Sequence, residues 1–449
     1  MRQVIDVSGI IDNQKIGFLQ TWILVFSFLA MMVDSFDAYS IAYVAPSLVR
    51  EWDVPRSAFT IVFTANVAGL AMGAILLGIL ASRLGNRRVL AMSMLIFGIL
   101  TFTKAFVSSI EWLAVLQFLA AIFVGAISPI VLSLISENTP KSVRATMLVI
   151  VSLGFILGAT MAGFMAGPVI TRLGWRWMFY IGTIMPAVLI FVALPFVPES
   201  LQRIVEQGES RKKLIEVISR VAPELTVQSD AEFIFPVTIS RPSFTLLFTG
   251  GRGPMTIALW VGIIAAYLVY YFLFSWIPLL LNGSGMSVSQ SLLGGAIFPT
   301  GGAVAGALFA YFSAKRPIHT ITGTFFVLST FSIVLLAHVH VPFIVPTLFV
   351  VGIGAIGGIL AGNALTSLFY PAELRTTGIG WACGIGRFGS MFGPLLGGVM
   401  LELKLTFSAM CLVLAVPALI SAIAFFLAGK FLGLGDLNSR QVSKKWDQA

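Results

Sequence analysis

Twelve long apolar blocks are the feature that most limits how this chain of 449 residues can fold. Each block runs about 20 residues or more, which is the length that a helix needs to cross roughly 30 Å of bilayer hydrocarbon. Hydrophobic residues make up 58% of the chain and charged residues only 10%, against about 25% charged residues in a soluble domain. We therefore predict an all-α integral membrane protein with twelve transmembrane helices.

A polar stretch at 198–253 separates the first six blocks from the last six. We predict that this stretch is a cytoplasmic linker with one short amphipathic helix. By residue number, the predicted helices are 20–48, 58–81, 89–108, 111–136, 144–170, 175–197, 254–281, 290–312, 318–337, 341–369, 373–400 and 406–431.

Short motifs recur at an offset of about 230 residues. The stretch PKSVRAT at 140–146 matches PAELRTT at 371–377, and Pro46 near the end of the first predicted helix matches Pro278 in the seventh. Transporters are commonly built from repeated bundles, with the substrate site near the midplane between them. We therefore predict two pseudo-symmetric six-helix bundles, divided into an N-terminal bundle at 1–197, the linker at 198–253, a C-terminal bundle at 254–431 and a cytoplasmic tail at 432–449.

The net charge of +9 follows the predicted topology rather than a nucleic-acid surface. When the N-terminus is placed in the cytoplasm, most of the 28 Lys and Arg residues fall in cytoplasmic loops. This asymmetry is the positive-inside rule. We therefore predict that both termini are cytoplasmic, that membrane lipid contacts the basic loops, and that nucleic acid is not a partner.

The stretch MMVDSFDAYS at 31–40 places two carboxylates, Asp34 and Asp37, inside the first apolar block. An ionised Asp at the bilayer centre costs roughly 2.5–3.5 kcal/mol on insertion scales. Residues three apart share a helix face, and a charged face should line a cavity or the bundle interior. Two buried carboxylates that close resist simultaneous ionisation, so one can hold and release a proton. We interpret the pair as a proton-coupling site; buried acids hydrogen-bonded only for packing are the alternative.

Arg387 is a second kind of buried charge, about midway along the eleventh predicted helix. Its anion would be Asp34, Asp37 or a ligand carboxylate, which the planar guanidinium can bind with two parallel hydrogen bonds. A permanent salt bridge to the first helix is the alternative. Rings, hydroxyls and amides would accompany a bound carboxylate, although each could instead serve packing between helices. The predicted substrate-binding residues are Arg387, Asp37, Tyr39, Asn66, Tyr270, Asn363 and Trp381.

The chain resembles transporters of the major facilitator superfamily, and within it the aromatic acid:proton symporter family. The acidic helix 1 element of that family matches DSFD at 34–37, and the strongest likeness is YPAELRTTGIGWACGIGRFGSMFGPLLGG at 370–398. The resemblance implies the major facilitator fold and proton-coupled import of a small aromatic carboxylate, benzoate-like or hydroxybenzoate-like, by alternating access across a bacterial inner membrane. It also favours gating roles for charges at the cytoplasmic helix ends, namely Arg83, Arg87, Arg88, Glu137, Arg144 and Arg375.

Two positions depart from the pattern of these relatives. Ser82 stands where the loop between helices 2 and 3 normally carries an acid, and Gln117 stands where family members usually carry an Arg in helix 4. The gate acid and the helix 4 arginine therefore do not carry over to this chain.

Enzyme chemistry finds little support in the sequence. The three histidines and two cysteines form no metal-ligand pattern, and no catalytic triad or Walker loop occurs in a credible context. We predict a monomeric transporter that is not an enzyme and holds no cofactor and no metal. One alternative is a facilitator or symporter of another organic acid, such as a quinate-, shikimate-, muconate- or nicotinate-like acid. The other is a membrane sensor that binds the same ligand without transporting it.

Overall fold

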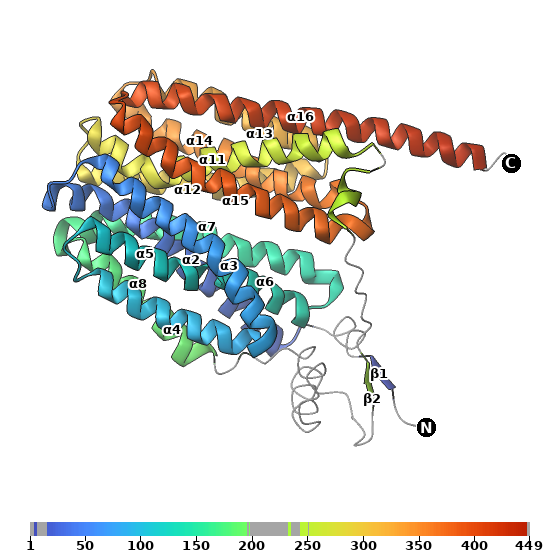
Figure 1. Cartoon of the computed structure of the whole chain (residues 1–449), viewed down its shortest axis with the longest axis horizontal. Coiled ribbons are helices and arrows are strands. Elements are labelled where there is room, and N and C mark those ends of the chain that lie inside the picture. The colour runs from blue at the N-terminus through green and yellow to red at the C-terminus, as the bar shows by residue number, and fades with distance from the viewer. Residues whose placement is uncertain are drawn as a thin grey trace. The chain divides into compact units, whose positions relative to one another are not determined.

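The computed structural model describes residues 4–6, 16–194, 197, 232–234, 243–249 and 251–446. Long helices follow one another along these residues (Figure 1). The first half contains α2 (Phe18–Glu51), η1 (Arg56–Ala58), α3 (Phe59–Leu84), α4 (Asn86–Lys104), α5 (Ile110–Gly125), α6 (Ile127–Asn138), α7 (Lys141–Leu173), α8 (Arg176–Val188) and η2 (Leu189–Ala193). The second half contains η4 (Phe244–Leu247), α11 (Gly253–Gly283), α12 (Val288–Ser313), α13 (Ile318–Leu336), α14 (Val341–Phe369), α15 (Ala372–Glu402) and α16 (Phe407–Trp446).

These helices correspond in order to the twelve predicted blocks. The segments α5 and α6 together form the fourth block, and α8 with η2 forms the sixth. Predicted and observed ends differ by no more than about one helical turn, except that α16 runs on to Trp446 through the region predicted as a tail (Figure 1). Among the described residues, nine helices are long and apolar enough to cross a membrane by themselves. The helix α8 is shorter, and α4 and α15 carry more polar and charged residues.

Local sequence explains where several helices begin and end. The Ser109 side chain accepts a hydrogen bond from the Trp112 backbone N–H at 3.4 Å and so caps α5. Ser287 and Gln290 form a reciprocal capping box at the start of α12. Gly85 separates α3 from α4 with a φ of 101°, a backbone conformation that favours glycine.

Contacts divide the chain into two compact units. The first unit comprises residues 1–44 and 61–239, and the second comprises 45–60 and 240–449. The last turns of α2 and the start of the following helix therefore belong with the second unit, although the sequence assigned them to the N-terminal bundle.

Each unit has its own apolar core. The core of the first unit gathers side chains from α2, α4, α5, α6 and α7, including Phe26 and Phe97. In the second unit Phe326 of α13 stacks on Phe425 of α16, with ring centroids 5.4 Å apart. Close helix packing depends on glycine at several places; for example, a Cβ at Gly158 would meet the Met32 carbonyl of α2, and one at Gly389 would meet the Ile264 carbonyl of α11.

A short parallel strand pair adds to the predicted all-helical fold. Strand β1 (Val4–Asp6) pairs with β2 (Glu232–Ile234), which lies within the predicted linker (Figure 1). The predicted amphipathic helix of the linker falls outside the described residues.

Candidate substrate and proton site

The two acids of α2 lie in the interior of the first unit. Asp34 is 5% exposed and Asp37 is 3% exposed. The Asp37 Oδ1 atom accepts a hydrogen bond from the Lys104 ammonium at 3.2 Å and a second one from the Thr101 hydroxyl at 3.3 Å. Both donors lie on the last turn of α4. The structure therefore joins α2 to α4 through a buried ion pair.

Lys104 is the functional candidate that the sequence analysis missed. It lies within the third predicted helix, 89–108, where no role was assigned to it, and its side chain has no exposed surface. Its ammonium also lies 5.8 Å from the centre of the Phe179 ring of α8, a cation–π distance. A signal was available in the sequence, because a Thr one turn before a Lys within an apolar block can partner a buried acid.

The Asp37–Lys104 pair balances two large opposing energies. At 3.2 Å and an effective dielectric constant of about 20, the Coulomb attraction is about 5 kcal/mol. Removing each ion from water costs several kcal/mol. The pair therefore adds little net stability, but loss of either charge leaves the other one buried and uncompensated.

The amide predicted on the second transmembrane helix is tied to a neighbouring helix. The Gln117 Nε2 group of α5 donates a hydrogen bond to Asn66 Oδ1 of α3 at 3.0 Å. Both residues are buried, and within the described residues the Gln117 Oε1 atom has no hydrogen-bond partner. The sequence left two roles open for Asn66, substrate binding and packing between helices. The structure shows a hydrogen bond between Asn66 and a neighbouring helix. Gln117, which stands where the family resemblance led us to expect an Arg, is the partner of Asn66.

Three helices of the second unit converge around Arg387. Arg387 is half-buried on α15. Tyr267 of α11 lies against α15 beside Arg387, because a Cβ at the neighbouring Gly386 would lie 3.4 Å from its ring. It is also within electrostatic range of Arg387 and close to the side chain of Asn363 on α14. The structure thus brings together two predicted substrate-binding residues, Arg387 and Asn363. It adds Tyr267, whereas the sequence had favoured Tyr270 on the same helix. A cation, an amide and a phenol in one place can bind a carboxylate and a polar ring substituent.

A row of aromatic rings continues from Tyr267 along α11. Tyr271 stacks on Tyr267 at 6.3 Å and meets Tyr270 edge-on at 5.1 Å. Tyr270 in turn lies 6.0 Å from Phe274 and 6.2 Å from Phe298 of α12. Offset and edge-on contacts of this kind suit aromatic rings, so the row offers a stacking surface beside the Arg387 group.

Two other predicted aromatic residues lie in separate clusters. Trp381 is 44% exposed, and its ring lies 4.3 Å from Phe244 of η4 and 6.3 Å from Trp260 of α11. Tyr39 stacks on Tyr43 at 6.2 Å, and both are buried on α2.

The predicted gating charges gather at helix ends of both units. Glu137 at the end of α6 accepts hydrogen bonds from Asn86 Nδ2 at 3.3 Å and from the Ser133 hydroxyl. The Arg144 guanidinium donates to the Thr139 carbonyl at 3.1 and 2.9 Å. The remaining gating candidates are exposed or half-buried, namely Arg83, Arg87, Arg88 and Arg375.

No group of three or more His, Cys, Asp or Glu side chains that could hold a metal occurs in the part of the chain that the structure describes.

Comparison with known proteins agrees with this architecture. The pattern of the Major Facilitator Superfamily matches residues 27–394. The 4-hydroxybenzoate transporter PcaK of Acinetobacter baylyi is 32% identical over 95% of this chain and 94% of its own length. The gallate transporter of Pseudomonas putida is 31% identical over 95% of both chains.

A solved D-xylose-proton symporter has a similar fold, with a TM-score of 0.70 at 16% identity over 90% of this chain and 97% of that one. The resemblance stated from the sequence is confirmed, as are the twelve-helix fold and the expectation of a transporter rather than an enzyme. The chain is a multi-pass membrane transporter that belongs to the major facilitator superfamily.

Proposed function

We propose that the chain imports a small aromatic carboxylate together with at least one proton, by alternating access. The observation that carries the proposal is the buried Asp37–Lys104 ion pair. A membrane interior tolerates such charges mainly where they serve a pathway or a proton relay. The substrate class is supported by the relatives, which are named as 4-hydroxybenzoate and gallate transporters.

The Arg387 group supplies the chemistry for an aromatic acid. Its guanidinium offers a fork of donors that matches a carboxylate. Tyr267 and Asn363 place a phenol and an amide near this guanidinium, where they can form hydrogen bonds with a ring hydroxyl. The tyrosines of α11 supply ring faces for stacking.

The Asp37–Lys104 pair supplies the coupling step. When a proton neutralises Asp37, the positive charge of Lys104 loses its counter-ion at 3.2 Å. Protonation of Asp37 adds one positive charge to the carrier and a carboxylate bound at Arg387 adds one negative charge, so binding both leaves its net charge unchanged and favours proton and anion together. Release of the proton restores the ion pair and returns the empty carrier to its starting charge. Asp34, buried one turn earlier on α2, provides a second acceptor.

Further parts of the proposal concern location and closure. We place the chain as a monomer in a bacterial inner membrane, with both termini cytoplasmic and lipid around the basic loops. The hydrogen bond from Asn86 to Glu137 joins the start of α4 to the end of α6, and Glu137 is the acid of the proposed inner gate. Arg83, Arg87, Arg88, Arg144 and Arg375 complete the proposed inner gate.

The test is uptake into proteoliposomes of labelled hydroxybenzoates, phenylpropionates and non-aromatic acids, with and without an inward proton gradient. The native chain should accumulate one aromatic acid above equilibrium, and Asp37→Asn should lose accumulation. Glu111→Gln, at the exposed start of α5, is the matched control and should behave as the native chain. Uptake that only equilibrates and ignores the gradient would identify a facilitator. Preference for a non-aromatic acid would refute the substrate class.

A further inference from the structure

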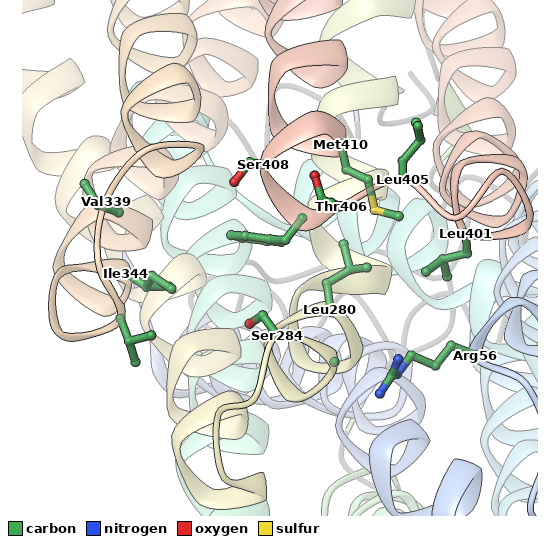
Figure 2. A pocket seen from close by; sticks show the side chains of 13 residues that line it. Arg56, Leu280, Ser284, Val339, Ile344, Leu401, Leu405, Thr406, Ser408 and Met410 are labelled. Carbon is green, nitrogen blue, oxygen red and sulfur yellow. The ribbon is translucent and has the colours of Figure 1, made fainter.

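A cavity at one end of the second unit is separate from the Arg387 group. It has a volume of about 480 Å³ and lies where η1, the end of α11, the α13–α14 connection and the α15–α16 connection meet. Figure 2 shows Arg56 at one edge, Val339 and Ile344 at the opposite edge, and Thr406 and Ser408 facing Leu280 and Ser284 across the space. In the predicted topology these connections all lie on the outer side of the membrane.

The lining of this cavity combines one cation with apolar walls. No Asp or Glu is among the lining residues, and Arg56 is the one charged group. Most of the wall is aliphatic, and Leu280, Ile344 and Met410 are buried parts of it. Ligand pockets of about 300–1,000 Å³ with mainly apolar walls and few polar groups are typical of small-molecule sites.

Arg56 and Thr406 have unused donor capacity at the cavity, whereas the Ser284 hydroxyl donates to the Leu281 carbonyl at 2.9 Å. Within the part of the chain that the structure describes, the Arg56 guanidinium makes no ion pair or hydrogen bond. The Thr406 hydroxyl accepts a bond from the Ala409 backbone N–H at 3.3 Å, which leaves its own hydrogen free to donate. An acid-free cavity with a cation and a free hydroxyl donor is complementary to an anion.

The backbone at the end of α11 lies close to Arg56. A Cβ at Gly283 would lie 3.0 Å from Arg56 Cζ, so the guanidinium rests against a glycine that makes room for it. Pro55, with a φ of −64°, fixes the chain just before η1. The guanidinium therefore lies at the edge of the cavity, beside the end of α11.

We propose that this cavity is an outer binding site for an anion with an apolar body, and that its occupant is the same class of small aromatic carboxylate that Arg387 binds. The carboxylate pairs with Arg56, and the ring lies against the aliphatic wall. This inference rests on the proposed function for its ligand. The site raises the concentration of substrate at the outer face, so it affects uptake at low substrate and leaves the maximal rate unchanged.

The first experiment is equilibrium binding of labelled 4-hydroxybenzoate to the full chain in phosphatidylcholine nanodiscs. We expect two equivalents for the native chain and one for Arg387→Gln, and adding Arg56→Gln to Arg387→Gln should weaken that remaining equivalent about tenfold. Arg56→Gln alone should raise the dissociation constant of the outer site by about tenfold, or about 1.4 kcal/mol. Arg50→Gln is the matched control. Arg50 is an exposed arginine in the last turn of α2 that does not line the cavity, so this variant should bind as the native chain does.

The second experiment measures uptake kinetics in proteoliposomes. Arg56→Gln should raise KM several-fold with an unchanged maximal rate. Ser408→Phe should do the same, because it fills the cavity from an exposed position while keeping the cation. Native levels of binding and KM in both variants would overturn the outer site. Native mass spectrometry tests for a lipid in the cavity. An anionic lipid bound to the native chain but not to Arg56→Gln would overturn the aromatic carboxylate as the occupant of the cavity.

The same vesicles separate this inference from the proposed function. Gradient-driven uptake of 4-hydroxybenzoate by the native chain with only one bound equivalent would overturn the outer site alone. Absence of native uptake for every aromatic acid would overturn the proposed function, and with it the ligand assigned to the cavity.

Discussion

Removing one charge of the Asp37–Lys104 pair should destabilise the protein far more than removing both. At 3.2 Å the gross attraction is about 5 kcal/mol at an effective dielectric constant of about 20. Both side chains are essentially buried, at 3% and 0% exposure, so solvent screens little of it. Loss of one partner from a buried pair costs about 3–5 kcal/mol. Asp37→Asn and Lys104→Met should each show a cost of this size.

The double variant is the sharper measurement. Asn and Met nearly match the volumes that they replace, and apolar or neutral replacement of a whole buried pair is often close to neutral. We therefore expect the double variant to be more stable than either single variant, which requires a coupling energy larger than the cost of either single variant, above about 3 kcal/mol. The assay is equilibrium unfolding in mixed micelles, with Lys404→Met, an exposed lysine, as the control. If the two single costs simply add, the pair does not interact and the coupling step proposed here is wrong.

Two further predictions follow from packing. Gly389→Ala should lower the unfolding midpoint of the protein, because the new Cβ would meet the Ile264 carbonyl. Gly384→Ala on the same helix is the control and should leave the midpoint unchanged, because a Cβ there has nothing within 4 Å. Equal midpoints for the two variants would contradict the close α11–α15 contact. Trp381→Ala should also lower the unfolding midpoint, because the Trp381 ring lies 4.3 Å from the Phe244 ring. The KM for uptake should stay within about twofold of the native value, and a factor of two in affinity is only about 0.4 kcal/mol. A tenfold rise in KM without loss of stability would restore Trp381 to the substrate site.

Properties that depend on one segment at a time were accessible from the sequence. Each helix was recognisable because a bilayer demands a minimum apolar length from every crossing segment. Residues such as Ser109 and Ser287 mark helix starts through hydrogen bonds within the same few residues. The acids of α2 stood out because charge in such a segment is costly wherever its neighbours lie.

Properties that depend on which helices pack against each other could not be predicted from the sequence. Lys104 is a buried counter-ion only because α2 and α8 pack against the end of α4. Gln117 was recognised as a departure from the relatives, but its bond to Asn66 arises from the packing of α5 on α3. The choice between Tyr267 and Tyr270, three residues apart on one helix, depends on which of them turns toward α14 and α15.

The sequence by itself determined the membrane class, the order and extent of the helices, and the presence of acids and an arginine within them. The tertiary structure determined the partners of those charges, because ion pairs and hydrogen bonds act over about 3 Å between segments far apart in the chain. Hydrophobic length is a property of one helix and tolerates errors of a turn. The pairing of Asp37 with Lys104 depends on the rotation and depth of two helices at once, and no local pattern encodes both.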